Sequence, residues 1–361
     1  MVTGTTDQPR VIDLFSGIGG LTHGFVLEGF DVVAGIDIDV SCRYAFESNN
    51  RSKFIRKDIA EVTAEELREL YGDKSFKILV ACAPCQPFSS LNLNRAVYQN
   101  SDAKWISLEY LVRLITKVRP DVVSMENVPE LANRKKFPIF DRFIRTLKRH
   151  GYYISYKVVD ASKYGVPQRR KRLVLLASQM GPISLLRETH ANRPVTVRQS
   201  IGDLLPIRDG ETSPSDALHK ASRLSDLNRK RIRATPKDGG SASSWDRKLL
   251  PKCFKDKRGA SYKCTVYGRM KWDEPAPTMT TQCGTLGTGR FGHPSQNRAI
   301  SLREAARFQT FPDYYKFDAF GNVQSSRVAK HIGNAVPVRL GQIIAMSIRS
   351  HLKEVSHGKT K

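Results

Sequence analysis

The chain has 361 residues and a formal net charge of +24 at pH 7, with a pI near 9.9. This length is enough for a large core in two domains. The excess of basic residues favours a polyanionic partner, nucleic acid before a membrane surface. Six scattered cysteines argue against a secreted disulfide scaffold, and neither a signal peptide nor an apolar run of membrane-spanning length is found. We therefore expect a protein of the reducing cytoplasm, with no membrane partner.

Short apolar runs alternate with helical patterns between residues 11 and 180. The runs predict strands over 11–15, 31–36, 76–81, 121–125, 152–159 and 173–177. Amphipathic stretches predict helices over 21–29, 63–71 and 107–118, and Thr63 with Glu66 forms a capping box for the second. Strands that alternate with helices imply right-handed crossovers, so the predicted fold class is α/β with a doubly wound, mostly parallel sheet.

A glycine-rich stretch, DLFSGIGG (13–20), follows the first strand and opens a helix. Its glycines let a ligand approach the backbone, and the start of the helix offers free N–H groups, although an ordinary tight turn fits as well. The dinucleotide fingerprint requires glycine where this chain has Thr22, so a pyrophosphate cradle is poorly matched. Asp37 and Asp58 follow the next two strands and could bind a ribose and a base edge. S-adenosylmethionine, an adenosine-type cofactor without pyrophosphate, fits this pattern.

Prolines on both sides of Cys85 restrict the backbone of ACAPCQPFSS (81–90). Three interpretations compete for this stretch: a redox or metal pair with Cys82, a buried structural thiol, or a nucleophile at a strand end. Glu126, in ENV (126–128), ends the next predicted strand. If both strands are parallel, Glu126 and Cys85 lie on the same carboxyl edge of the sheet.

The alternation stops after about residue 182. Between Lys220 and Arg258 there are thirteen basic residues and four acidic ones, interrupted by GGSASS (239–244). Such a segment is either a solvated basic loop or a nucleic-acid surface. Helical patterns return over 301–311, where Ser301 and Glu304 form a second capping box, and over 337–352.

Six stretches in order resemble the cytosine-C5 DNA methyltransferase family of bacterial restriction–modification systems. They are DLFSGIGG, PCQPFS (84–89), ENV, QRRKR (168–172), RAISLREAARFQTFPD (298–313) and HIGNAVP (331–337). The resemblance implies an S-adenosylmethionine-dependent, Rossmann-like catalytic and cofactor-binding domain over 1–185. It further implies a smaller, basic target-recognition domain over 186–300, followed by a hinge and a C-terminal helix that returns to the catalytic domain over 301–361.

The resemblance also assigns the chemistry. The thiolate of Cys85 would add to C6 of cytosine, which makes C5 nucleophilic toward the methyl group of a sulfonium. Glu126 would hold a proton at N3. Arg170 and Arg172 would bind the cytosine O2, a phosphate or Glu126 itself. A redox or metal pair of Cys82 and Cys85 lacks a thioredoxin-like context and a second cysteine pair at ligand spacing.

The remaining site residues fall into two groups. The predicted cofactor ligands are Phe15, Gly17, Gly19, Gly20, Asp37, Asp58 and Asn334. Phe15 would stack on adenine, and the resemblance implies that Asn334 lies near the methionine end. The predicted DNA contacts are Gln86, Ser89, Arg229, Lys230, Arg231 and Arg233. No metal site is predicted.

The resulting hypothesis is a DNA (cytosine-5)-methyltransferase that flips a cytosine out of a specific duplex sequence. We expect a monomer that works beside a restriction endonuclease in the bacterial cytoplasm, on the nucleoid. A tRNA cytosine-C5 methyltransferase would share these motifs, whereas a catalytically silent DNA-binding relative would lack Cys85 or Glu126. No pattern in residues 186–300 reveals the recognition sequence.

Overall fold

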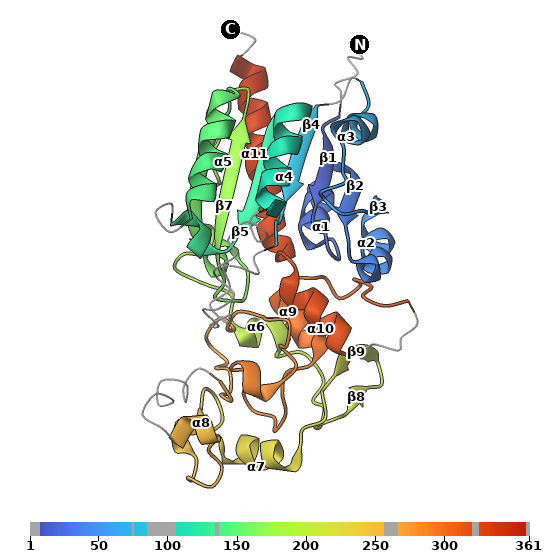
Figure 1. Ribbon diagram of the computed structural model, residues 1–361. Coiled ribbons are helices and arrows are strands. Elements are labelled where there is room, and N and C mark those ends of the chain that lie inside the picture. Colours follow the sequence, from blue (N-terminus) through green and yellow to red (C-terminus); the bar gives the residue numbers. More distant parts are fainter. Residues whose placement is uncertain are drawn as a thin grey trace. The chain divides into compact units, whose positions relative to one another are not determined.

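The structure, a computed structural model, is shown in Figure 1. It describes residues 8–73, 76–84, 106–133, 137–255, 266–319 and 325–358. Its contacts divide the chain into two compact units. The first, here called the sheet unit, comprises Met1–Asp160, Lys171–Arg187 and Val338–Lys361. The second unit comprises Ala161–Arg170 and Glu188–Pro337, so it takes in residues 301–337 as well as the basic segment.

A seven-stranded sheet with the strand order β3-β2-β1-β4-β5-β7-β6 forms the centre of the sheet unit. Its strands are β1 (Arg10–Leu14), β2 (Asp31–Asp37), β3 (Lys53–Arg56), β4 (Lys77–Ala81), β5 (Val122–Asn127), β6 (Tyr153–Asp160) and β7 (Lys171–Ser178). β7 pairs antiparallel with both neighbours, and the other pairs are parallel. The predicted fold class is therefore confirmed. β3, which was expected only from Asp58 at its end, has no apolar run in the sequence because Phe54 is its one buried side chain.

The strand order reverses between β1 and β4, and ligands of doubly wound sheets bind at such a switch point. The reversed direction of β7 has a second consequence. In the β5–β7 ladder, Glu126 pairs with Val174 and Asn127 pairs with Leu173. The first residues of β7 therefore lie beside the last residues of β5, and Arg172 lies at the same carboxyl edge as Glu126.

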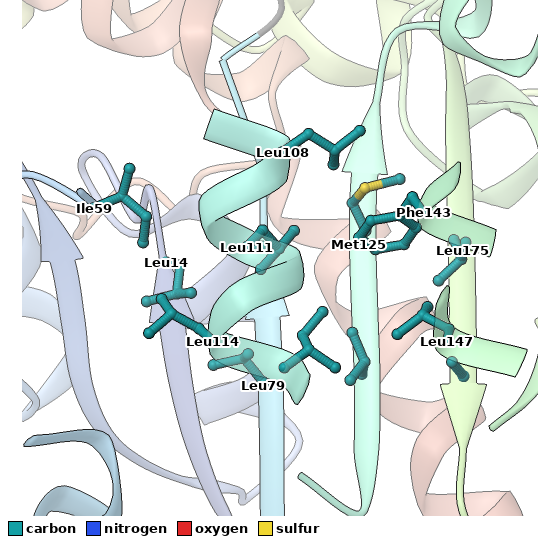
Figure 2. Close-up of a cluster of buried hydrophobic side chains, with 14 of the residues drawn as sticks. Leu14, Ile59, Leu79, Leu108, Leu111, Leu114, Met125, Phe143, Leu147 and Leu175 are labelled. Carbon is teal, nitrogen blue, oxygen red and sulfur yellow. The ribbon is translucent and has the colours of Figure 1, made fainter. Parts of the chain in front are cut away.

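Helices cover both faces of the sheet. They are α1 (Gly20–Leu27), α2 (Arg43–Asn50), α3 (Ala64–Tyr71), α4 (Ile106–Val118), α5 (Pro138–Arg149) and α11 (Val338–Gly358). Leu108, Leu111 and Leu114 of α4 recur at helical spacing and pack toward the strands and α5 (Figure 2). In the view of Figure 1, α4 and α5 lie in front of the sheet and α11 lies behind it. The capping box of Thr63 and Glu66 is present at α3.

The second unit contains short elements joined by irregular chain. Its helices and strands are α6 (Val197–Ile201), β8 (Thr212–Ser213), β9 (Asp216–Lys220), α7 (Asp226–Ala234), α8 (Lys252–Lys255), α9 (Leu302–Phe308) and α10 (Ser325–Asn334). The described residues of both units also include the 3-10 turns η1 (Val40–Cys42), η4 (Pro129–Ala132), η5 (Ala161–Tyr164), η6 (Ala242–Ser244) and η8 (Leu286–Thr288). The capping box of Ser301 and Glu304 is present at α9. Within the described ranges, no helix has the length and apolarity that crossing a membrane requires.

Buried arginines stabilise the irregular chain of the second unit. Arg269, 1% exposed, donates to the carbonyl oxygens of Ile232 and Thr235 at the end of α7 and to that of His293. Burial by itself lowers the pKa of Arg269 to about 10. Each buried carbonyl oxygen needs a hydrogen-bond donor. The guanidinium group of Arg269 supplies several such donors, as backbone N–H groups do in a β-sheet.

Arg298 and Glu304 form a fully buried ion pair, with both N···O distances at 2.7 Å. Burial alone would raise the pKa of Glu304, but the hydrogen bonds and the charge of Arg298 outweigh it and hold this pKa at about 2. The pair therefore remains charged at neutral pH and ties the start of α9 to the preceding chain.

The C-terminal helix α11 approaches α1 closely because each helix has a glycine at the crossing. A Cβ atom at Gly24 would lie 2.6 Å from the backbone of Gly341, and one at Gly341 would lie 3.0 Å from the carbonyl oxygen of Leu21. A side chain at either position would have to separate the backbones. The helix that follows the glycine-rich turn is thus held by the last helix of the chain.

We expect Gly24→Ala to lower the free energy of unfolding by about 1–3 kcal/mol, because the added methyl group overpacks the crossing. Urea denaturation would measure the loss. Lys353→Ala, at an exposed position of α11, is the matched control and should change stability little. Equal stability of Gly24→Ala and the wild type would show that the crossing tolerates a side chain.

Candidate active site

The glycine-rich turn after β1 has an unusual backbone. Phe15, Gly17 and Gly19 have φ angles of 59°, 50° and 83°, in the left-handed region. Glycine adopts this region without strain, whereas a bulky residue such as Phe15 rarely does. A Cβ atom at Gly17 would meet no described atom within 4 Å. The turn therefore presents bare backbone to open space, where a ligand can approach it.

Asp37 connects the end of β2 to this turn. Its Oδ2 accepts a hydrogen bond from the backbone N–H of Gly17 at 2.8 Å, and its Oδ1 accepts one from Asp39, also at 2.8 Å. Burial raises the pKa of Asp37, and these two backbone donors partly offset that effect. The structure therefore brings two of the predicted cofactor residues, Gly17 and Asp37, into direct contact.

Two further side chains mark the same edge of the sheet. Asp58 follows β3, is exposed, and caps its own turn by accepting a hydrogen bond from Ala60 at 2.9 Å. Ile38 follows Asp37 directly and is 61% exposed. The sequence analysis did not select Ile38. Its signal is an isoleucine between two aspartates at a strand end, where an exposed apolar side chain can support a flat ligand.

Asp13 is a buried acid that the sequence analysis also left out. It is 1% exposed, and its Oδ2 accepts a hydrogen bond from the Thr22 hydroxyl at 2.6 Å. Its Oδ1 has no hydrogen-bond partner among the described residues. Burial raises the pKa of Asp13 to about 7; the Thr22 bond opposes this rise and the nearby charge of Asp37 adds to it. Thr22, where a dinucleotide fold would have glycine, thus joins α1 to β1.

Glu126 lies at the carboxyl edge of β5 between two side chains from neighbouring strands. It is 2% exposed, and Arg172 Nε lies 3.0 Å from its Oε1. The Cys82 thiol donates a hydrogen bond to Oε2 at 3.0 Å. The Arg172 contact is an ion pair without hydrogen-bond geometry, so Oε1 has no hydrogen-bond donor in the described part of the chain. Asn127 donates to the carbonyl oxygen of Ala83 at 3.2 Å and so holds the chain that leads toward Cys85.

Arg170 has different partners from Arg172. Arg170, 3% exposed, donates to the carbonyl oxygens of Met279 (3.1 Å), Gly333 (3.4 Å) and Ala335 (3.3 Å), all within the second unit. These contacts connect QRRKR to the HIGNAVP stretch. Of the two arginines, Arg172 is the one whose described contacts include Glu126. Asn334, the last residue of α10, is exposed.

Two of the four basic residues of α7 take part in internal contacts. Arg229 forms ion pairs with Asp209 at 2.9 Å and with Asp226 at 2.6 Å. Arg231 is 8% exposed and donates to the carbonyl oxygen of Leu249 at 2.9 Å. Both guanidinium groups are therefore committed to the fold of the second unit.

The other two basic residues of α7 face outward. Lys230 and Arg233 are exposed and lie three positions apart, on one side of the helix. Neither forms an ion pair with any residue whose placement is described. The neighbouring Arg231 lies over the rings of Trp245 and Tyr267, which fixes the opposite side of the helix. The α7 helix thus presents Lys230 and Arg233 from a rigid base.

Comparison with known proteins identifies the family. A family model for C-5 cytosine-specific DNA methylases matches residues 9–350. The chain belongs to this family. The type II methylase M.HgiDII of Herpetosiphon aurantiacus is 49% identical over 344 residues, which cover 95% of this chain and 96% of that protein. The type II methyltransferase M1.BsuMI of Bacillus subtilis is 33% identical over 361 residues, covering 95% and 81%.

Two solved structures have the same fold as this cytosine methylase. A crystal structure of an E. coli prophage protein, described as a DNA modification methyltransferase, has a TM-score of 0.71 at 22% identity and covers 96% of this chain and 99% of that one. The Entamoeba histolytica methyltransferase EhMeth has a TM-score of 0.66 at 17% identity, with coverages of 96% and 99%. The predicted family and enzyme class are thus confirmed: the chain is a DNA cytosine-5-methyltransferase.

The predicted site residues of this methylase divide by what the structure describes. Cys85, Gln86 and Ser89 lie outside the described residues. Glu126 and Arg172 are in contact with each other, and Asp37 is in contact with Gly17. Sequence reasoning missed Asp13 and the Cys82 contact, because one depends on burial and the other on a neighbour from another strand. It also missed Ile38, although the flanking aspartates at a strand end were a usable signal.

Because Asp13 is buried and has a raised pKa, we expect the free energy of unfolding to depend on pH. Between its ordinary pKa of 3.8 and about 7, folded Asp13 keeps a proton that the unfolded chain has released. Stability from this group is therefore present at low pH and lost as pH rises toward 7, by about 1.4 kcal/mol per pH unit at most. Asp13→Asn keeps an acceptor for Thr22 but cannot titrate, so its free energy of unfolding should fall less between pH 5 and 7. Urea denaturation across this range would test it; parallel curves for the two proteins would contradict it.

Proposed function

We propose that this methyltransferase transfers a methyl group from S-adenosylmethionine to C5 of a cytosine that has flipped out of a specific duplex DNA sequence. The observation that carries the proposal is the position of Glu126 between Arg172 and Cys82. Its carboxyl group is buried, and one of its oxygens has no hydrogen-bond donor among the described residues. Such an oxygen suits a protonated ring nitrogen or an exocyclic amine of a base.

The turn after β1 and the end of β2 fit the cofactor. Gly17 leaves its backbone open to a ligand, and Asp37 faces that backbone with a carboxylate that can accept ribose hydroxyls. Phe15 and Ile38 supply apolar surface for the adenine, and Asp58 is free to meet its amine. Gly19 and Gly20 begin α1, whose first N–H groups favour a carboxylate. When bound, the cofactor supplies an electrophilic methyl group.

The protein residues have separate tasks in the proposed reaction. The thiolate of Cys85 forms a bond to C6 of cytosine, and electron density moves to N3 and C5. Glu126 holds the proton at N3, while Arg172 balances the charge of the carboxylate. C5 then takes the methyl group, loses its proton to a base, and the bond between Cys85 and C6 breaks. Arg170 is proposed here to position HIGNAVP, with Asn334 at the cofactor, rather than to touch cytosine.

The second unit is proposed to hold the target-recognition domain, residues 186–300, and residues 301–337 to serve as the hinge. Exposed basic residues there suit the phosphates of duplex DNA, since phosphate contacts supply most of the salt-dependent affinity. The relatives M.HgiDII and M1.BsuMI are named type II enzymes, which supports a restriction–modification role beside an endonuclease, in the bacterial cytoplasm. We propose a monomer. Methyl transfer to tRNA but not to duplex DNA would replace this assignment with the RNA enzyme.

The outward residues of α7 should contact phosphates and the inward ones should not. We expect the double change Lys230→Ala and Arg233→Ala to weaken DNA binding and to flatten the dependence of log affinity on log salt by about 0.9 per lost phosphate contact. Arg229→Gln is the matched control: its ion pairs are internal, so the slope should stay the same. Fluorescence anisotropy from low to moderate salt would measure both slopes. Equal slopes for the double variant and the wild type would remove α7 from the DNA surface.

Duplex DNA that carries 5-fluorocytosine at the target site tests the covalent mechanism. Fluorine cannot leave C5 as a cation, so the bond between Cys85 and C6 should persist after methyl transfer. The complex should survive denaturing electrophoresis, and peptide mapping should locate the link at Cys85, not at Cys82. Cys85→Ala should still bind DNA without trapping it. Glu126→Gln should bind DNA but react about 10²–10⁴-fold more slowly, as expected for a lost general acid. A link at another residue would refute the mechanism.

A further inference from the structure

Cys82 occupies a position that the proposed mechanism does not use. Its backbone N–H donates to the carbonyl oxygen of Leu14 at 3.2 Å, which fixes the end of β4 against β1. Its side chain points the other way, to β5, where the thiol donates to Glu126 Oε2 at 3.0 Å. Sulfur hydrogen bonds are longer than those of oxygen, and 3.0 Å is a close approach for a thiol donor. The thiol thus contacts the carboxyl group assigned to cytosine.

The two oxygens of Glu126 have different surroundings. Oε2 accepts from the neutral thiol of Cys82, whereas Oε1 lies near the charged Nε of Arg172 without accepting a hydrogen bond from it. One directional bond and one charge contact, from opposite sides, set the rotation of the carboxyl plane. Without the thiol, the carboxyl group could rotate toward Arg172 and make a bidentate pair, which would occupy the oxygen that cytosine needs.

We propose that Cys82 is a positioning residue, whose thiol holds the Glu126 carboxyl group in the orientation that receives cytosine. This inference rests on the proposed role of Glu126. It assigns Cys82 a task distinct from both a redox pair and a metal ligand. A thiol suits the task because it is a weak, neutral donor: it orients the carboxylate but adds no charge that would compete with the base.

Two variants without the donor and one with a donor test this. Cys82→Ala and Cys82→Val remove the hydrogen bond, and Val fills the volume of the thiol if Ala proves unstable. Single-turnover methylation of duplex DNA should slow by about 10-fold, the change that corresponds to a hydrogen bond of roughly 1.4 kcal/mol. The dissociation constants for DNA and for S-adenosylmethionine should stay at the wild-type values. Cys82→Ser, which keeps a donor, should restore most of the rate.

Cys283→Ala is the matched control, because it removes another buried thiol, one that belongs to the second unit. Its single-turnover rate should equal that of the wild type. Thermal denaturation of every variant would show that the compared proteins are folded. A wild-type rate for Cys82→Val, or an equal loss for Cys82→Ser and Cys82→Val, would overturn the positioning role.

Glu126→Gln separates the two proposals. If Glu126→Gln is slow and Cys82→Val reacts at the wild-type rate, the assignment of Glu126 stands and only the role of Cys82 falls. If Glu126→Gln itself reacts at the wild-type rate, the proposed function of the carboxyl group falls, and the positioning role falls with it. A slow Glu126→Gln, a slow Cys82→Val and an active Cys82→Ser together support both.

Discussion

The direction of the strands in one sheet is the constraint on which the site depends. β1, β2, β4 and β5 run parallel, so the glycine-rich turn, Asp37, Cys82 and Glu126 all lie at their carboxyl ends. β7 runs the other way, and its first residues reach the same edge. Residues at the ends of five strands therefore lie along one edge of the sheet. The apolar core beneath, with its leucines from α4, keeps that edge rigid.

Burial of charge at this edge is balanced by specific partners. Glu126 has Arg172 and Cys82, and Asp37 has two backbone donors. Asp13 has one partner, Thr22, and burial accordingly moves its pKa to about 7. An isolated buried charge is unfavourable, so a group with few donors retains its proton, whereas a group with several can stay ionised. At Asp13, burial outweighs the Thr22 hydrogen bond, whereas at Asp37 two backbone donors offset part of the effect of burial on the pKa.

The second unit is stabilised by hydrogen bonds from buried arginine side chains. Its helices are short, and its irregular chain is organised by guanidinium groups that donate to many carbonyl oxygens, with Arg269 and Arg298 as the most buried. Arg231 has the same task beneath α7, where two aromatic rings pack against it. A large share of the basic composition can therefore serve the fold, and net charge overstates the number of residues that are available to DNA. On α7, Lys230 and Arg233 are the basic residues that remain exposed.

The alternation of strands and helices, the two capping boxes and the ordered stretches that indicate a cytosine methyltransferase are all readable in the amino-acid sequence. These signals are local: periodicity, turn residues and spacing are read within a few positions. Three features of the site came from the tertiary structure alone: Arg172 meets Glu126, Cys82 donates to Glu126 across 44 positions of chain, and Asp13 is buried. Such contacts depend on strand direction and register, and a change of register by one residue turns a side chain to the other face of the sheet. No local pattern contains that information.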